Sequence, residues 1–248
     1  MQGTEEKPKF RIDFHSHVLP QMDDGSASVE ESLEMLAASR AQGVEVMLAT
    51  PHFYAVDESL ELFLERRARA AEMLREQYHS ELHPRICLGA EVEFFSGIAR
   101  SRLTEQLTVA GTRLILVEMP FMRWSEAQIA ELAFLRENRG LIPVVAHIER
   151  YEKYQKRGTV ESLIERGILF QSNAEYFLDA KTAKRAKRRL LRGEIAVIGS
   201  DSHNMSTRVP NLMQACEEIE RSGGAEILEE MQRFGEALLQ GATFLENL

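Results

Sequence analysis

Short apolar runs alternate with stretches of helical periodicity along almost the whole chain. Seven runs have the length and composition of buried strands, at Phe10–Phe14, Val44–Ala49, Arg85–Val92, Thr112–Glu118, Ile142–Ala146, Ile168–Gln171 and Ala196–Gly199. The amphipathic stretches between them predict helices at about 28–42, 57–80, 125–138, 159–166 and 180–192, with a helical C-terminus after about 206. The short stretch 96–110 gives no clear signal. This alternation is typical of parallel strands joined by right-handed crossovers.

Local signals support several of these boundaries. Ser28, with Glu31 three residues later, predicts a capping box at the start of the first long helix. Four glycines stand where a predicted helix ends and the next strand begins, the usual place of a left-handed C-cap: Gly43, Gly140, Gly167 and Gly193.

The chain contains no internal repeat, no low-complexity segment and no linker that would divide it. Its 248 residues suit one large α/β domain, and seven strands come one short of a (β/α)8 barrel. We therefore assign residues 10–248 to a single barrel-like domain. Residues 1–9 form a polar N-terminal extension with no apolar signal region.

Composition narrows the class of protein. The chain is 44% hydrophobic and carries a net charge of −9, which argues against a nucleic-acid-binding surface. The two cysteines, Cys87 and Cys216, form no C-x-x-C pair, as expected in a reducing compartment. No apolar run approaches the roughly 20 residues that span a bilayer. We expect a cytoplasmic protein without membrane insertion; the oligomeric state stays open.

Histidines and acids follow most of the predicted strands. His15 and His17 end the first strand two residues apart, so both imidazoles can project to one face. Asp23 and Asp24 precede the turn glycine Gly25. The later strands are followed by His52, by Glu91 and Glu93, by Glu118, by His147 and Glu149, and by Asp201 and His203.

These side chains predict a metal site. Barrel enzymes build their sites at the C-terminal ends of their strands. Each residue alone has an ordinary structural interpretation, but so many carboxylates together without counter-ions would cost several kcal/mol. Imidazole and carboxylate without thiolate suit zinc, manganese or iron. Five histidines and at least four acids are too many ligands for one ion and suggest two or three ions, which could generate a hydroxide nucleophile from water.

Two arginines stand close to these ligands in sequence. Arg150 and Arg208 would suit an anionic substrate such as a phosphate ester, although each could instead be a structural salt-bridge partner. Cysteine-dependent phosphate chemistry needs an arginine six positions after the cysteine. Positions 93 and 222 are Glu and Ser, so a thiol nucleophile is not expected.

Taken in order, FHSHVLPQMDDG, ATPHF, GAEVEF, VEMPF, AHIERY and SDSHN resemble the polymerase and histidinol phosphatase (PHP) family. The chain is most similar to the branch of bacterial metal-dependent tyrosine-protein phosphatases from capsule and exopolysaccharide loci. The similarity runs from about Phe10 to the C-terminal helix. It implies a distorted (β/α)7 TIM-like barrel that hydrolyses phosphotyrosine. The resemblance also implies two or three divalent ions, most often manganese, and a protein substrate such as the tail of a bacterial tyrosine kinase.

The resemblance also implies a trinuclear ligand set. The first ion would be held by His15, His17, Glu91 and Asp201; the second by Glu91, Glu118 and His147; the third by Asp24, His52 and His203. Arg150 and Arg208 would be catalytic. The chain departs from the branch pattern in three places: Phe53 follows His52 where a second histidine is usual, Ile148 replaces a proline, and Gln21 replaces a glycine.

Other functions remain open at this point. A phosphoesterase of the same fold could act on a small phosphomonoester such as histidinol phosphate. Amidohydrolases also begin with H-x-H, but commonly bridge their metals with a modified lysine where this chain has Glu118. A non-catalytic metal-binding role is the third possibility.

The segment from Lys181 to Arg192 holds seven basic residues and no acid. It is either a solvated helix face or a docking surface for an acidic, phosphotyrosine-bearing tail. In the second case Lys181, Lys184 and Arg188 would share the docking face, because they lie at three- and four-residue spacing.

Overall fold

The computed structural model describes residues 10–247, so the predicted extension 1–9 lies outside the described residues. All paired strands in this part of the chain run parallel, as the alternating pattern predicts. The strands are β1 (Ile12–Ser16), β2 (Val46–Ala49), β3 (His52–Phe53), β4 (Arg85–Leu88), β5 (Glu91–Glu93), β6 (Leu114–Glu118), β7 (Ile142–Val145), β8 (Leu169–Asn173) and β9 (Val197–Gly199).

These strands form two sheets, in the orders β1-β2-β4 and β3-β5-β6-β7-β8-β9. One predicted strand is broken, because β4 leads through Gly89 and Ala90 into β5. The single strand predicted for Arg85–Val92 is therefore wrong at its centre. Strand β2 ends at Ala49 as predicted, but after Thr50 and Pro51 it is followed by the short strand β3, which was not predicted. Pro51 has no N–H to donate to a neighbouring strand, which favours an interruption at that point.

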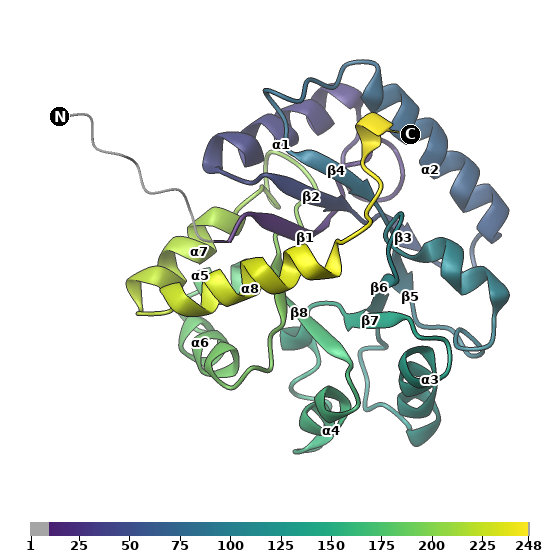
Figure 1. The fold of residues 1–248 in the computed structure, drawn as a ribbon, viewed down its shortest axis with the longest axis vertical. Coiled ribbons are helices and arrows are strands. Elements are labelled where there is room, and N and C mark those ends of the chain that lie inside the picture. Colours follow the sequence, from purple (N-terminus) through teal and green to yellow (C-terminus); the bar gives the residue numbers. More distant parts are fainter. Residues whose placement is uncertain (1–9, 248) are drawn as a thin grey trace.

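The last strand returns to the first, so the sheets form a curled parallel assembly (Figure 1). The Asp201 N–H donates to the carbonyl of His15 at 2.8 Å, and the His17 N–H donates to the carbonyl of Ser202 at 2.9 Å. These two bonds bring the residues after β9 beside the end of β1. The chain thus places its first and last chemically active segments next to each other.

Helices surround the strands on the outside (Figure 1). They are α1 (Val29–Gln42), α2 (Leu60–Arg75), α3 (Glu126–Glu137), α4 (Thr159–Glu165), α5 (Glu175–Leu178), α6 (Ala183–Leu191), α7 (Leu212–Arg221) and α8 (Ala225–Leu238). Three 3-10 turns complete the order: η1 (Arg102–Leu107), η2 (Ile148–Arg150) and η3 (Leu245–Asn247). The helix predicted for 180–192 is shorter than expected.

The predicted helix ends are confirmed in part. Ser28 caps α1, its hydroxyl accepting from the Glu31 N–H at 3.2 Å. The Glu31 carboxylate, however, accepts from the Ala27 N–H at 2.9 Å, so only half of the predicted capping box forms. The four predicted glycines all have positive φ, at Gly43, Gly140, Gly167 and Gly193.

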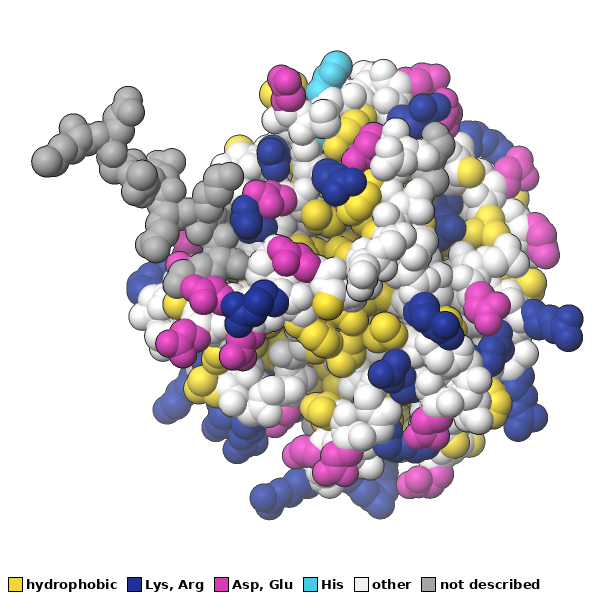
Figure 2. All heavy atoms as spheres, in the orientation of Figure 1, with side chains coloured by type: hydrophobic (Ala, Val, Ile, Leu, Met, Phe, Trp, Pro, Cys, Tyr) yellow, Lys and Arg dark blue, Asp and Glu magenta, His cyan; other side chains and the backbone are white. Residues whose placement is uncertain are grey.

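The core lies between the strands and the helices that cover them. The five residues of β6, LILVE, are all buried, as expected of a parallel strand covered on both faces. Helix α8 crosses β1 at Gly235, where an added Cβ would lie 3.0 Å from the ring of Phe14 (Figure 1). Figure 2 shows this side of the molecule, with hydrophobic side chains gathered below α8. Across residues 10–247, none of the helices has both the length and the apolarity needed to cross a membrane.

Candidate metal centre

The end of β1 and the segment after β9 form the most deeply buried part of the site. The Nε2 atoms of His15 and His17 lie 3.1 Å apart, and each lies 3.5 Å from Oδ1 of Asp201. Oε2 of Glu91, from β5, lies 3.0 Å from the first imidazole nitrogen and 3.3 Å from the second. Four candidate donor atoms therefore converge on one point, and all four residues are buried.

The outer nitrogens of these two histidines are already engaged. Nδ1 of His15 lies 3.3 Å from Oε1 of Gln171, and Nδ1 of His17 lies 2.7 Å from Oδ2 of Asp23. An acceptor at Nδ1 keeps the proton there and leaves the Nε2 lone pair directed inward, as in metal-binding histidines. The geometry thus prepares both imidazoles to bind an ion.

A second set of donors lies on the side of β6 and β7. Nε2 of His147 is 2.9 Å from Oε1 of Glu91 and 3.2 Å from Oε1 of Glu118. Glu91 therefore faces both sets, one oxygen to each, as a bridging carboxylate would. His52 also approaches this region, with its Nδ1 3.2 Å from Oε2 of Glu91.

A third set lies nearest the solvent. Oδ1 of Asp24 is 3.3 Å from Nε2 of His203 and 3.8 Å from Nε2 of His52. Nδ1 of His203 lies 2.9 Å from the carbonyl of Asp201, so Nε2 is the free donor atom. His17 belongs to this group as well, because its ring centroid lies 3.9 Å from that of His203.

The residues of the cluster fit divalent cations. The donor atoms form three groups of histidines and acids, and within each group they lie within 4.8 Å of one another. Nδ1 of His52 and Nε2 of His203 are buried without a hydrogen-bond partner. Such atoms are costly unless something satisfies them, and an ion would do so. Imidazole and carboxylate donors are those preferred by zinc, manganese and iron.

The electrostatics of the cluster favour ionised carboxylates. Burial opposes the charge on Glu91, but His15, His147 and His17 outweigh it and hold the pKa of this carboxyl well below its usual range. The pKa of Asp201 is likewise held well below its usual range, because His15 and His17 outweigh its burial. Both acids are therefore anionic at neutral pH, as metal ligands must be.

The pKa values of two histidines in the cluster are shifted in opposite directions. Burial lowers the pKa of His203 to about 4, assisted by the nearby His17. Burial also opposes the charge on His147, but hydrogen bonds to Glu118 and Glu91 outweigh it and raise its pKa to about 9. His203 is therefore neutral at pH 7, as an imidazole that binds a metal must be.

Both predicted arginines lie at the mouth of the cluster. Arg150 and Arg208 each place an Nη2 atom 2.7 Å from Oδ2 of Asp201, and each side chain is 38% exposed. Nδ2 of Asn173 donates to the same oxygen at 2.7 Å. Asp201 thus directs Oδ1 toward the histidines and Oδ2 toward these cations. All four residues line a cleft of about 380 Å³.

Backbone strain is concentrated at this mouth. Among the described residues, the non-glycine residues with positive φ are Gln21, His147 and Asp201. Two of these are candidate ligands, and the third is the position where the family pattern has glycine. Each left-handed residue costs about 1–2 kcal/mol, and such strain is usually retained where function requires it.

Close packing also restricts the loop that carries the aspartates. A Cβ added at Gly25 would lie 2.4 Å from the carbonyl oxygen of His17. The Gly25 N–H donates to Oδ1 of Asp23 at 2.9 Å. This glycine therefore lets the loop fold back over β1, which holds Asp23 against the imidazole of His17.

The structure brings together all nine predicted ligands and both arginines. Sequence reasoning missed the supporting role of Asp23, Gln171 and Asn173. For two of them the signal was present in β8, LFQSN, where Gln171 and Asn173 are two residues apart and share one face of the strand. The Gln171 amide donates to Oδ1 of Asn173 at 3.0 Å, which connects His15 to Asp201.

The remaining histidines and the cysteines lie outside the cluster. Nδ1 of His83 accepts from the His79 N–H at 3.0 Å, close to the end of α2. Cys87 and Cys216 are buried and free. Burial raises the pKa of the Cys87 thiol to about 12 and raises the pKa of Cys216 further still. Neither cysteine is a competent nucleophile.

A curled parallel α/β sheet with histidines and carboxylates at its strand ends is typical of metal-dependent hydrolases. Residues 11–237 match the family described as "Capsular polysaccharide synthesis, CpsB/CapC". The chain belongs to this family.

Relatives and solved structures that resemble this chain are consistent with its family. The chain is 30% identical to the tyrosine-protein phosphatase YwqE of Bacillus subtilis, over 95% of this chain and 94% of that protein. It is 33% identical to the tyrosine-protein phosphatase CpsB of Streptococcus pneumoniae, over 89% and 94%. A crystal structure from work on these two proteins, described as unique metal-dependent tyrosine phosphatases, matches with a TM-score of 0.80 and 26% identity over 94% and 95%. The phosphotriesterase homology protein of Escherichia coli shares the fold, with a TM-score of 0.56 and 13% identity over 94% and 100%.

Proposed function

We propose that this protein is a metal-dependent protein-tyrosine phosphatase built on a distorted (β/α)7 barrel that spans residues 10–248. The observation that supports it most is the meeting of a buried histidine–carboxylate cluster with two guanidiniums at Asp201. Its relatives named tyrosine-protein phosphatases point the same way.

Three ligand sets have the donor geometry to hold the ions. The first is His15, His17, Glu91 and Asp201; the second is Glu91, Glu118 and His147; the third is Asp24, His52 and His203. Manganese is the proposed metal, with iron or zinc as alternatives. When bound, the ions would activate water at neutral pH and neutralise charge on the phosphate.

The two arginines would bind the phosphate itself. Both guanidiniums now contact Oδ2 of Asp201, and both are partly exposed, so they can reorient toward an anion in the cleft. A guanidinium aimed at the equatorial oxygens stabilises the charge that spreads over them in the transition state. Arg150 and Arg208 would therefore act on the reaction while Asp201 holds them in position.

Aromatic side chains beside the cluster favour an aryl substrate over histidinol phosphate. The ring of Phe121 stacks against His147 with centroids 6.0 Å apart, and 48% of the residue is exposed. Tyr54 stacks against His52 at 5.0 Å. Both rings could contact the phenyl ring of phosphotyrosine, since aromatic pairs form at centroid distances of about 4.5–7 Å.

The proposed physiological substrate is a phosphotyrosine protein of the capsule or exopolysaccharide system, a tyrosine kinase in the first place, encountered in the cytoplasm. The family description supports the link to capsular polysaccharide synthesis.

The decisive experiment compares the turnover of a phosphotyrosine peptide and of histidinol phosphate, at equal concentration and with manganese added. We expect the peptide to be hydrolysed with the higher kcat/KM. Faster hydrolysis of histidinol phosphate would overturn the proposal in favour of a small-molecule phosphoesterase. Full activity after complete removal of metal, verified by elemental analysis, would overturn the metal-dependent mechanism.

A further inference from the structure

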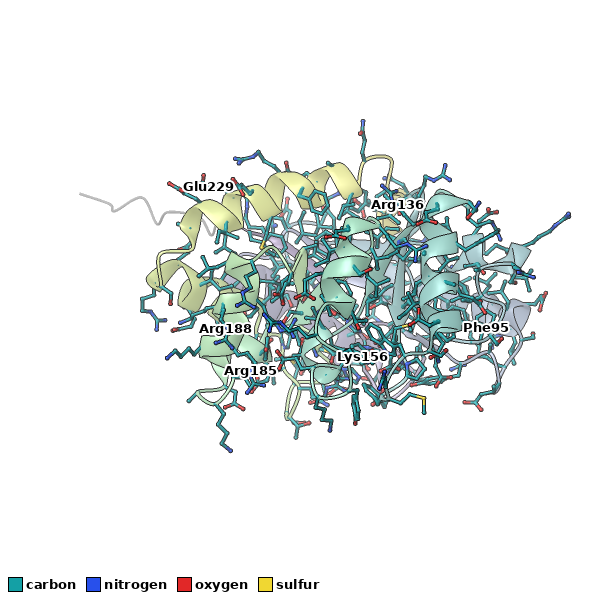
Figure 3. All side chains as sticks on the ribbon, turned by 90° about the horizontal axis from the view of Figure 1, so that it is seen from below. Phe95, Arg136, Lys156, Arg185, Arg188 and Glu229 are labelled. Carbon is teal, nitrogen blue, oxygen red and sulfur yellow. The ribbon has the colours of Figure 1, made fainter. Side chains whose placement is uncertain are left out.

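A second, basic cleft lies beside the mouth of the metal cluster, between α6 and the loop that follows η2. It has a volume of about 220 Å³. Three acids, Glu152, Glu161 and Glu194, line it together with twice as many basic side chains: Lys156, Arg157, Arg185, Arg188, Arg189 and Arg192. Figure 3 shows Arg185 and Arg188 on α6 and Lys156 on the neighbouring loop, all on the side of the molecule away from α8.

This basic cleft is connected to the cleft at the metal cluster by shared lining residues. A hollow of about 570 Å³ lies between the two. It shares Glu149 and Arg150 with the cleft at the cluster. It shares Glu152, Arg185 and Arg189 with the basic cleft. An extended peptide could therefore place one side chain at the metals and a later side chain in the basic cleft.

Half of the cations in the basic cleft are already neutralised. Glu152 accepts from Arg185 at 2.7 Å and also pairs with Arg189. Glu194 pairs with Arg189 at 2.6 Å and lies 3.6 Å from Arg192. These ion pairs hold part of the wall of the cleft in place.

Three cations remain without an acidic partner among residues 10–247: Lys156, Arg157 and Arg188. The dipole of α6 favours cations near its C-terminus and could account for Arg188. It does not account for Lys156 and Arg157, which belong to another segment. Unpaired cations from two walls of one cleft indicate a site for an anion.

The face of α6 that lines the cleft differs from the one predicted. Arg185, Arg188 and Arg192 recur at three- and four-residue spacing and share one side of the helix. Lys181 and Lys184 are exposed and do not line the cleft. Of the predicted docking face of Lys181, Lys184 and Arg188, only Arg188 lines the cleft.

We propose that the basic cleft binds a second anionic side chain, a phosphotyrosine or a carboxylate, of the same peptide whose phosphotyrosine occupies the metal cluster. The proposal rests on the proposed function for the identity of the first group. The cleft would increase the affinity for multiply phosphorylated or acidic peptides, and it would leave the hydrolysis of small aryl phosphates unchanged.

The test uses two double variants of the metal-loaded protein. Arg188→Ala with Lys156→Ala removes two unpaired cations from the cleft. Lys181→Ala with Lys184→Ala removes the same charge from the exposed side of the same segment and is the matched control. Both variants should melt like the wild type, since the substituted side chains are exposed and unpaired.

Each variant is assayed on an aryl phosphate and on a peptide with one phosphotyrosine. It is also assayed on peptides of equal length that carry, on either side of this phosphotyrosine, a second phosphotyrosine or a pair of glutamates. For the doubly charged peptides, we expect the cleft variant to lose about tenfold in kcat/KM and the control to lose less than twofold, at low salt. The loss should disappear for the aryl phosphate. The phosphotyrosine and glutamate peptides show which anion the cleft prefers.

Equal losses in the two variants would overturn the proposal, because they would reflect the overall field of the protein. No loss in either would also overturn it. Binding of peptides that carry non-hydrolysable phosphonate analogues, followed by fluorescence anisotropy, separates this site from catalysis. If the wild type binds such peptides through the cleft but hydrolyses no aryl phosphate, the proposed function fails and the cleft stands. Binding of phosphatidylglycerol vesicles that depends on Arg188 and Lys156, without any effect on peptides, would assign the cleft to a membrane surface and overturn the proposal.

Discussion

The metal cluster and the basic cleft are neighbouring charged regions that differ in how their charge is compensated. In the cluster, Glu91 and Asp201 are buried and each faces several imidazoles. In the cleft, Arg188 and Lys156 are exposed to solvent and line the same open hollow. Buried charge must be compensated by fixed partners, whereas exposed charge is compensated by water and salt.

This difference predicts how each region responds to change. Removing a member of the cluster leaves other buried groups without partners and disturbs the whole site. Removing a member of the cleft changes only an attraction that ionic strength already weakens. Effects in the cluster should therefore be large and nearly independent of salt, and effects in the cleft small and salt-dependent.

The largest expected effect comes from removing a ligand. His147→Ala or Asp201→Ala should lower kcat/KM by about a thousandfold or more, because each change removes both a donor and the geometry of the ion. Chelation should have the same effect, with recovery on adding manganese. His79→Ala, an exposed histidine away from the site, is the matched control and should keep full activity. Activity within tenfold of the wild type in both ligand variants would exclude the proposed centre.

The next largest effect should come from removing an arginine that would bind the phosphate of the substrate. Arg208→Ala should lower the rate by about 10- to 1,000-fold, because it removes charge stabilisation in the transition state. Metal content, measured by elemental analysis, should stay at the wild-type level, and Arg208→Lys should recover part of the rate. Loss of metal together with activity would instead make Arg208 a residue that positions Asp201, which it contacts at 2.7 Å.

Supporting residues of the cluster should have a smaller effect. Asp23→Ala and Gln171→Ala each remove the partner that orients one imidazole. We expect metal affinity to fall by about 10- to 100-fold. Titration of metal-free protein with manganese measures this directly. If both variants bind manganese like the wild type, the orientation of these histidines comes from the backbone alone.

In the wall of the basic cleft, Glu152 should stabilise the fold in a pH-dependent way. Burial opposes its charge, but Arg185 and Arg189 outweigh it and lower its pKa below the usual 4.5. Because the folded pKa is lowered, its contribution is complete above pH 4.5 and is lost as the pH falls through the folded value. Glu152→Gln should therefore lower Tm by a few degrees at pH 7, with a difference that shrinks below pH 4.5. If Tm is lowered equally at pH 7 and below pH 4.5, Glu152 stabilises the fold through packing and not through its charge.

The smallest expected effect is a gain in stability. Gln21 has φ 59, where glycine is favoured, and its side chain is exposed. Gln21→Gly should stabilise the protein by about 0.5–1 kcal/mol, since relief of left-handed strain outweighs the added freedom of the unfolded chain. Denaturant unfolding of both proteins measures the difference. A loss of stability would show that the strain is compensated by contacts of Gln21.

Much of the fold could be predicted from the sequence, because parallel strands and their helices leave periodic patterns. The seven passes and the positive-φ glycines were found in this way. The break at Gly89 was not, since a pause between two short strands leaves an apolar run uninterrupted, and the two-residue strand β3 was not predicted either. The start of α6 was also misplaced, because the basic run begins at Lys181 and the helix only at Ala183.

The sequence alone placed the candidate ligands after the C-terminal ends of the strands. Parallel strands present their C-terminal ends at one edge, so residues after those ends must converge whatever the details of packing. The tertiary structure decided which neighbours orient them and which arginines of α6 line a cleft. Gln171 reaches His15, and Lys156 lines one cleft with Arg188, only because the curl of the sheet and the path of the loop after η2 bring distant segments together. Such contacts depend on the position of the whole chain, and no local pattern records them.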